Sequence, residues 1–193
     1  AYNTSAATGI GAFTAVTNYT GAFLSSVAFA STGTGNQATF VAVGGAAATA
    51  VAISSTSGTS WANTPTTLTS SNFPAGSITY AGGSNWVAGT VSNASLNNAN
   101  MFVSSDNANT WVAVGLPFAP TVTNGVSINA LTYIPSLGII VAAYNAPAGA
   151  TSASVPISFT GILVASSSNL FQWSAIPSLQ YLAYGALNRF ITF

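Results

Sequence analysis

The sequence predicts an all-β protein: a four-repeat, β-propeller-like array of four-stranded blades, each about 50 residues long. Apolar residues alternate with polar ones at a period of two, and Gly, Asn and Pro separate the apolar runs. This pattern is typical of short strands joined by turns, and no helix is predicted. Two further landmarks recur in phase along the chain, and together they define the repeats.

The first landmark is a short polar turn that ends in an aromatic residue. Residues 104–111 contain the only acidic residue, Asp106, and residues 54–61 and 166–173 share their outline of a leading Ser with a Trp seven positions later. A weaker copy at 6–13 keeps only the final aromatic. An apolar strand precedes each of the three stronger copies, which predicts a hairpin, and such small polar residues suit tight turns. The residues expected to shape these turns are Asp106, Ser104, Ser54, Gly58 and Ser166.

The second landmark is an apolar strand that carries an aromatic residue. Its four copies contain Phe29, Tyr80, Tyr133 and Tyr184, at intervals of 51, 53 and 51 residues. In the last three copies the next apolar strand begins six residues after the aromatic, at Trp86, Ile139 and Phe190. We therefore expect four strands in each repeat: two around the aromatic landmark and two around the turn that ends in an aromatic residue.

These landmarks divide the chain into a single domain, 1–193, of three whole repeats and two halves. The predicted units are a half-repeat 1–23, repeats at about 24–68, 69–120 and 121–178, and a half-repeat 179–193. An open half-sheet would expose unpaired backbone groups, so we expect the two halves to build a fourth blade from both chain ends. Within one chain this gives a closed four-bladed propeller. Between chains it gives a head-to-tail filament by strand addition.

Charge is almost absent, which excludes several functions. The chain has one Lys or Arg, one Asp or Glu, no His and no Cys, so Asp106 and Arg189 are its only charged side chains. One carboxylate supplies no acid and base pair, and we expect no enzyme activity. No cofactor or metal site is predicted, because thiolates are absent and one carboxylate is a poor start for calcium. Nucleic acid is not an expected partner, since phosphate contacts need many basic residues.

A membrane-spanning helix is not predicted either. The longest apolar run, residues 40–53, is shorter than the roughly 20 residues that a spanning helix needs. An outer-membrane β-barrel is a weaker alternative, because it would point Arg189 toward lipid beside two apolar residues of the same alternation.

The three stronger turns resemble the Asp-box, or BNR, repeat of sialidase-like β-propellers, whose pattern is Ser-x-Asp-x-Gly-x-Thr-Trp. The Asp of this pattern is present at Asp106, the Gly at Gly58 and the Trp in all three turns. The strands around the Tyr landmarks are similar to propeller repeats of bacterial extracellular and phage-tail proteins. The resemblance covers nearly the whole chain and implies that Asp106 ties its own turn. It does not imply sialidase chemistry, because the Arg cluster and the Glu of those enzymes have no counterparts here.

The remaining candidate residues are aromatic side chains and glycosylation acceptors. The aromatic residues are expected to pack between blades, with sugar stacking as the alternative: Trp61, Trp111, Trp173, Tyr80, Tyr133 and Tyr184. Asn3, Asn18 and Asn93 fit the N-glycosylation pattern Asn-x-Ser/Thr.

The expected function is that of an extracellular or cell-surface, secreted structural subunit that associates with copies of itself into a filament, sheath or appendage. Glycosylation is an open alternative for this subunit, and it is expected to tolerate acid. A near-zero net charge on a surface of small polar and apolar groups favours such association. The alternatives are a glycan-binding propeller lectin or adhesin, and a phage tail or fibre component.

Overall fold

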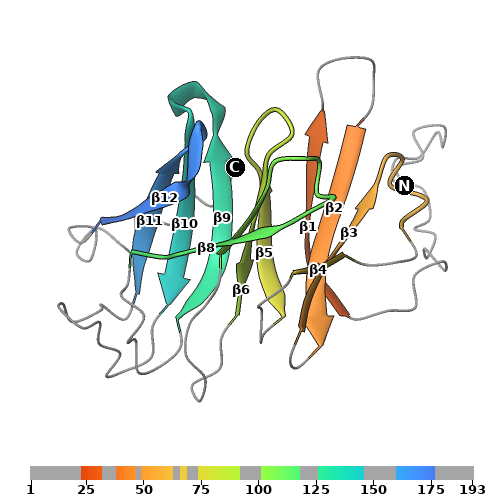
Figure 1. The fold of residues 1–193 in the computed structure, drawn as a ribbon, viewed down its shortest axis with the longest axis horizontal. Helices are drawn as coiled ribbons and strands as arrows, with labels where there is room; N and C mark the ends of the chain where they lie inside the picture. Colours follow the sequence, from red (N-terminus) through yellow and green to blue (C-terminus); the bar gives the residue numbers. More distant parts are fainter. Residues whose placement is uncertain are drawn as a thin grey trace, which may run out of the picture.

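The structure, a computed structural model, describes residues 23–31, 38–46, 49–62, 66–68, 74–91, 101–117, 126–145 and 160–176. The protein is all-β in these residues, as predicted, and its strands form three antiparallel sheets of four strands each (Figure 1). Each sheet is a meander, because strands that follow one another in sequence are also neighbours in the sheet.

The four strands of each sheet fall within one of the predicted repeats, except for a single residue. The first sheet contains β1 (Phe23–Ser31), β2 (Ala38–Ala46), β3 (Thr49–Ser55) and β4 (Thr66–Leu68). The second contains β5 (Ala75–Tyr80), β6 (Trp86–Thr90), β7 (Met101–Ser104) and β8 (Val112–Val114). The third contains β9 (Ser127–Ile134), β10 (Ile139–Asn145), β11 (Thr160–Ser166) and β12 (Asn169–Ile176). Only Phe23 falls outside, in the segment expected to be a half-repeat.

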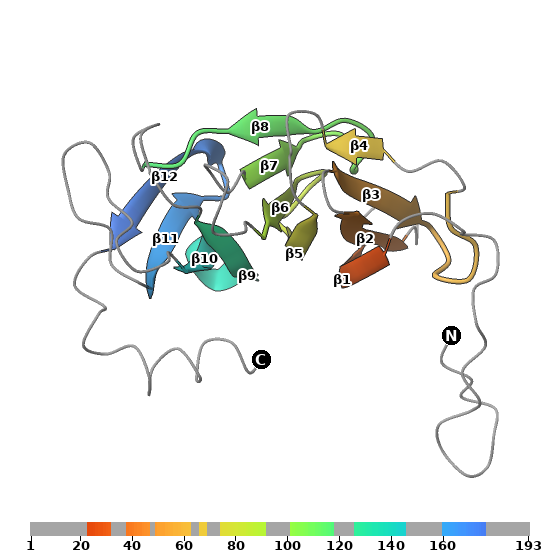
Figure 2. The same cartoon turned by 90° about the horizontal axis from the view of Figure 1, so that it is seen from below.

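The three sheets follow one another in chain order, with the second sheet in the middle (Figure 2). Their first strands β1, β5 and β9 lie next to each other. Two side-chain hydrogen bonds join these strands: Ser25 Oγ donates to the Ala75 carbonyl oxygen at 2.5 Å, and Ser77 Oγ donates to that of Ile128 at 3.0 Å. Successive sheets are therefore tied together at their inner strands.

Two apolar clusters fill the spaces between the sheets. One, between the first and second sheets, includes Val41, Val43, Ala52, Ile78, Trp86, Phe102 and Trp111. The other, between the second and third sheets, includes Val87, Met101, Val103, Ile140, Leu163 and Trp173. The middle sheet is thus covered on both faces, and every residue of β6 is buried. This accounts for the continuous apolar run in that strand, where a half-exposed strand would alternate.

One glycine allows the second and third sheets to approach closely. A Cβ placed on Gly89 of β6 would lie 2.5 Å from the Cβ of Ile128 in β9. Real side chains do not come that close, so any larger residue at position 89 would push β9 away. The absence of a side chain at Gly89 therefore sets the spacing of these strands.

The connection between β9 and β10 is a single 3-10 turn, η1 (Pro135–Leu137), and Gly138 closes it with a left-handed backbone. As expected, β10 begins at Ile139, six residues after Tyr133. Because this turn adds one residue, Tyr133 pairs with Ile140. Ile139 instead pairs with Ile134.

The three sheets have the same register. The landmark aromatics pair with the next strand as Phe29 with Phe40, Tyr80 with Trp86, and Tyr133 with Ile140. Two residues earlier, the equivalent pairs are Val27 with Ala42, Ile78 with Ala88, and Leu131 with Ala142. Equivalent positions can therefore be compared between sheets.

Candidate functional site

The turn at Asp106 is held by the carboxylate and by the hydroxyl that precedes it. Asp106 Oδ1 accepts from the Thr110 backbone N–H at 2.9 Å, and Oδ2 accepts from the Thr110 hydroxyl at 2.6 Å. Ser104 Oγ donates to Asp106 Oδ1 at 2.8 Å and accepts from the Ala108 N–H at 2.9 Å. These bonds hold Asn107 and Ala108 in left-handed conformations, at φ 59° and 64°. Asp106 therefore has a structural role in its own turn.

The environment of Asp106 favours its charged form. The hydrogen bond from the Thr110 side chain lowers the pKa of the carboxyl group below its ordinary value, and the Thr110 backbone N–H lowers it further. Partial burial acts in the opposite direction, but it is a smaller effect than either bond. The carboxylate stays ionised in mildly acidic solution.

The turn of the first sheet uses Ser55 where the sequence pointed to Ser54. Ser55 Oγ accepts from the N–H groups of Ser57 and Gly58, at 3.2 and 2.8 Å. Ser54 instead belongs to β3 and pairs with Val41. Counting back seven residues from Trp61 selects Ser54 instead of Ser55, because this turn is one residue shorter than the turn at Asp106.

Other residues of the same turn do have the expected kind of role. Ser57 Oγ takes the place of the carboxylate and accepts from the Thr59 and Ser60 N–H groups, both at 3.2 Å. Gly58 has φ 73°, which suits glycine.

The third turn is tighter than the other two. Ser166 pairs with Asn169 across a two-residue connection, and its Oγ lies 2.7 Å from the hydroxyl of Ser168. The Ser168 N–H also donates to Ser166 Oγ at 3.2 Å. Ser166 is thus a turn residue, in a short hairpin rather than in the longer loop seen at Asp106.

The turn tryptophans divide into two that are covered and one that is not. Trp111 and Trp173 are 7% and 5% exposed, and each packs against the sheet that precedes its own. Trp61 belongs to the first sheet and is partly exposed on the face that points away from the second sheet. Packing between sheets therefore holds for Trp111 and Trp173, while no described strand covers Trp61.

The two described landmark tyrosines also lie at a boundary between sheets. The ring of Tyr80 contacts Trp86 at 5.3 Å and meets Tyr133 of the third sheet perpendicularly at 6.4 Å. The Tyr80 hydroxyl donates to the Gly83 carbonyl at 3.0 Å. Tyr184, Arg189 and the three candidate glycosylation residues Asn3, Asn18 and Asn93 lie outside the described residues.

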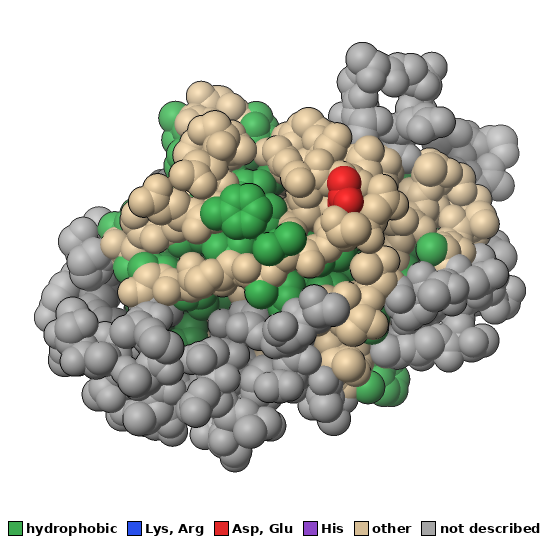
Figure 3. Space-filling model, in the orientation of Figure 1, with side chains coloured by type: hydrophobic (Ala, Val, Ile, Leu, Met, Phe, Trp, Pro, Cys, Tyr) green, Lys and Arg blue, Asp and Glu red, His purple; other side chains and the backbone are tan. Residues whose placement is uncertain are grey.

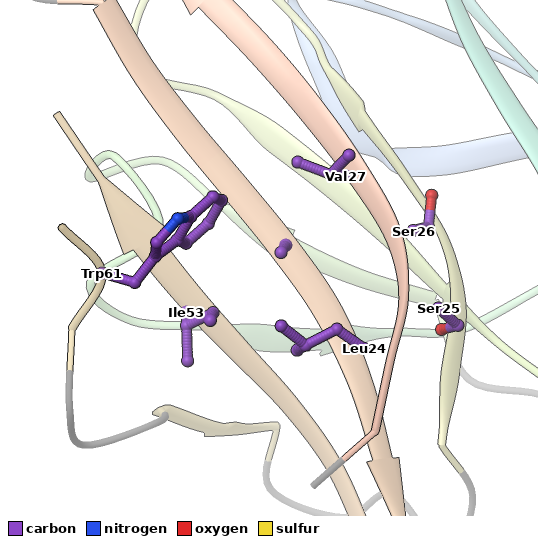
Figure 4. Close-up of a pocket in the computed structure, with 7 residues that line it drawn as sticks. Leu24, Ser25, Ser26, Val27, Ile53 and Trp61 are labelled. Atoms are coloured by element: carbon purple, nitrogen blue, oxygen red, sulfur yellow. The ribbon is translucent and has the colours of Figure 1, made fainter. Parts of the chain in front are cut away.

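The side chains around Trp61 form an open apolar groove of about 450 Å³, which we call the Trp61 groove (Figure 4). Its lining residues are Leu24, Ser25, Ser26, Val27, Ala42, Ile53 and Trp61. They come from β1, β2, β3 and the turn after β3, so the groove lies across the outer face of the first sheet. None of them carries a charge.

The exposure of this face is unusual for its position in the repeat. Val27 is 60% exposed, although its equivalent in the second sheet, Ile78, is 6% exposed. Phe29 is 52% exposed, and its ring contacts that of Phe40 at 4.8 Å between centroids. The Trp61 groove is thus lined by the kind of side chains that are buried between the other sheets, but no described sheet packs against it. The sequence pattern pointed to Trp61 but not to Val27, because Val27 and the buried Ile78 are apolar residues at equivalent positions.

The front face in Figure 1 is nearly uncharged as well. Figure 3 shows acidic side chains at only one place on this face, and hydrophobic side chains gathered where β8 and β12 lie. Val112 of β8 and Phe171 of β12 are 54% and 56% exposed. Over the described ranges, no three His, Cys, Asp or Glu residues gather as a metal site would require. Within the same ranges, no helix has the length and apolar character needed to cross a membrane.

No protein-family model and no curated protein sequence matches this chain.

Proposed function

We propose that this protein is a non-enzymatic structural subunit of an extracellular assembly, and that it associates head-to-tail with copies of itself. The observation that carries the proposal is the Trp61 groove, which is apolar and open although the equivalent faces of the other two sheets are buried. Two charged side chains in 193 residues provide almost no repulsion between copies. A filament, sheath or appendage is the assembly that such a contact would build.

The proposed complete architecture is a four-repeat, propeller-like array. Residues 179–193 and 1–22 would supply the fourth blade, and a head-to-tail assembly would place these two parts on neighbouring copies. A heterologous contact of this kind extends without closing unless its rotation happens to close a ring. The turn at Asp106, tied through Thr110, supports the resemblance to the Asp-box repeat of sialidase-like propellers.

A structural role also agrees with the chemistry of the carboxylate. Asp106 is engaged by Thr110 and Ser104, and a lowered pKa makes it a weak base in neutral solution. No second carboxylate exists to act with it as in glycoside hydrolysis.

Sedimentation velocity over a range of protein concentrations tests the proposed function, with electron microscopy of the largest species. We expect the weight-average mass to rise with concentration and ordered linear particles to be visible. A protein that stays monomeric at every concentration would refute the proposal.

A second candidate function is glycan binding, as in a lectin or adhesin or in a phage tail or fibre component. The observation in its favour is that Trp61, a partly exposed aromatic residue, lines the same open groove as Ser25 and Ser26. Aromatic faces and hydroxyl groups are common in sugar sites. A glycan array with the wild type and Trp61→Ala separates the two: sugar binding that is lost in the variant supports this candidate, and an array without signal removes it.

A further inference from the structure

We propose that Ile191 and Phe193 of a neighbouring copy fill the Trp61 groove and form the contact by which copies associate. This inference rests on the proposed function, since it names the two surfaces that would meet. It follows from a packing rule that the two inter-sheet contacts of the described structure share.

The rule concerns the two faces of each sheet. The face that carries the turn tryptophan packs against the preceding sheet, as Trp111 does with the first sheet and Trp173 with the second. The opposite face packs against the following sheet, and it contributes Val41 and Val43 to one contact and Val87 to the other. Each contact therefore joins a tryptophan face to an opposite face.

No described sheet packs against the tryptophan face of the first sheet. Its opposite face is buried against the second sheet, while the Trp61 groove remains open and Val27 is exposed. By the rule, the groove is shaped for the opposite face of another sheet. Its occupant should supply apolar side chains at the positions of Val41 and Val43.

The register identifies these positions in the C-terminal half-repeat. Val41 follows Phe40, and Val87 follows Trp86, where Phe40 and Trp86 pair with the landmark aromatics Phe29 and Tyr80. Tyr184 and Phe190 repeat the six-residue spacing of Tyr80 and Trp86. Ile191 therefore falls at the position of Val41 and Val87, both of which are fully buried.

By the same spacing, Phe193 falls at the position of Val43, two residues after Ile191 in the sequence. Residues two apart in a strand point to the same face, so Ile191 and Phe193 would enter the groove together. Arg189, two residues before Ile191, would share that face. Its long side chain would then stay at the rim of the groove, with the guanidinium in water.

A second copy is the occupant that fits the arrangement of the sheets. The first and third sheets lie at opposite ends of the series, with the second between them (Figure 2). The Trp61 groove opens on the face of the first sheet that points away from the other two. A copy that docks there continues the series, and it repeats a packing arrangement already present twice in each chain.

Disulfide trapping tests the contact directly, because the chain contains no Cys. Val27→Cys and Ile191→Cys would be prepared as separate full-length variants, mixed under mild oxidation and separated on a non-reducing gel. Each copy then has one thiol, so a covalent heterodimer can form only between copies. We expect a heterodimer from this mixture. The control mixture is Leu137→Cys with Ile191→Cys, since Leu137 is exposed but lies in η1; it should give much less heterodimer.

The double variant Val27→Cys/Ile191→Cys distinguishes the two ways in which the groove can be filled. A covalent ladder of dimers and longer species supports docking between copies. A monomer with an internal disulfide would overturn the inference, because the groove would be filled by the same chain. Absence of any disulfide above the control would overturn it as well.

A charge placed in the groove provides a second measurement. Val27→Lys should reduce association at least tenfold, because the ammonium would be buried in the contact. Val112→Lys is the matched control, since Val112 has a similar exposure outside the groove, and it should associate as the wild type does. A wild type that never associates defeats the proposed function itself. If the wild type associates and Val27→Lys does so equally well, only the inference about the groove fails.

Discussion

At the scale of single residues, the three turn tryptophans share a position but differ in their hydrogen bonding. The Trp61 and Trp173 indole N–H groups donate to the carbonyl three residues earlier, those of Gly58 and Leu170, at 3.1 and 2.8 Å. The N–H of Trp111 is buried and has no acceptor in the described part of the chain. A buried donor without a partner is unfavourable, so Trp111 contributes less than its apolar area suggests.

This difference predicts unequal effects of the same substitution. Trp173→Phe removes a buried hydrogen bond together with part of the ring, whereas Trp111→Phe removes an N–H that has no partner. We expect Trp173→Phe to lower the free energy of unfolding by about 1 kcal/mol more than Trp111→Phe. Urea unfolding of both variants at one low protein concentration measures the difference. Equal or greater destabilisation in Trp111→Phe would contradict it.

Asp106 predicts the dependence of stability on pH. Its folded-state pKa is lowered by the Thr110 hydrogen bonds, so its contribution to stability is fully present above the unfolded pKa of about 3.9. The contribution is lost as pH falls through the lower, folded value. No other Asp or Glu side chain, and no His, exists to add to it. We expect the Tm to be nearly constant from neutral pH to about pH 4, with a decline of only a few degrees below that.

Asp106→Asn tests this assignment. The amide cannot ionise, so the variant should lose the decline at low pH while its Tm at neutral pH falls slightly. Thermal melts across the acid range, followed by circular dichroism, measure both effects. A wild type whose Tm collapses by tens of degrees in mild acid, or a variant with an unchanged decline, would show that Asp106 is not the responsible group.

At the scale of sheets and strands, the contact between β6 and β9 depends on a missing side chain. Gly89→Ala would place a methyl group 2.5 Å from Ile128 Cβ, and both residues are buried. We expect a loss of about 1 to 3 kcal/mol in the free energy of unfolding, as for other overpacked cores. Gly115→Ala is the control, because its Cβ would have no neighbour within 4 Å. Chemical denaturation measures both variants, and equal stabilities would contradict the prediction.

The strands themselves were predictable because each combines β-branched or aromatic residues with flanking turn signals. The spacing of the aromatic landmarks placed β5, β6 and β7 well, since the intervals between successive landmarks differ little in length. It failed by one residue at Ser55, where a shorter loop changed the spacing. It also did not reveal that the 3-10 turn makes Ile140 the partner of Tyr133. The pattern of aromatic residues gives the order of the strands along the chain. It does not reveal a one-residue change in the length of a turn, because the backbone of the turn absorbs that change.

The Trp61 groove was not predictable from the pattern for a different reason. Val27 and Ile78 occupy equivalent positions and are both apolar, so the sequence gives no sign that one is covered and the other exposed. Exposure depends on which sheet follows which in space. Only the arrangement of the three sheets distinguishes the end of the series from its middle.

At the scale of the whole molecule, the near absence of charge determines how association should respond to salt. The Trp61 groove is lined by uncharged residues, and the chain carries one side chain of each sign. Raising NaCl from about 0.01 M to about 1 M shortens the Debye length from about 30 to about 3 Å, which weakens only charge-driven contacts. We expect the association constant to be unchanged or slightly higher across that range.

Ammonium sulfate and temperature should move the same constant in a defined direction. Sulfate strengthens the burial of apolar surface, and apolar association weakens on cooling, so copies should associate more tightly with added sulfate and less tightly in the cold. Val27→Lys should associate weakly under all of these conditions, because salt does not remove the penalty for burying its ammonium group. Sedimentation velocity at fixed protein concentration measures each response. A constant that falls steeply with NaCl would mean that charged groups drive association, which an apolar contact centred on Trp61 does not allow.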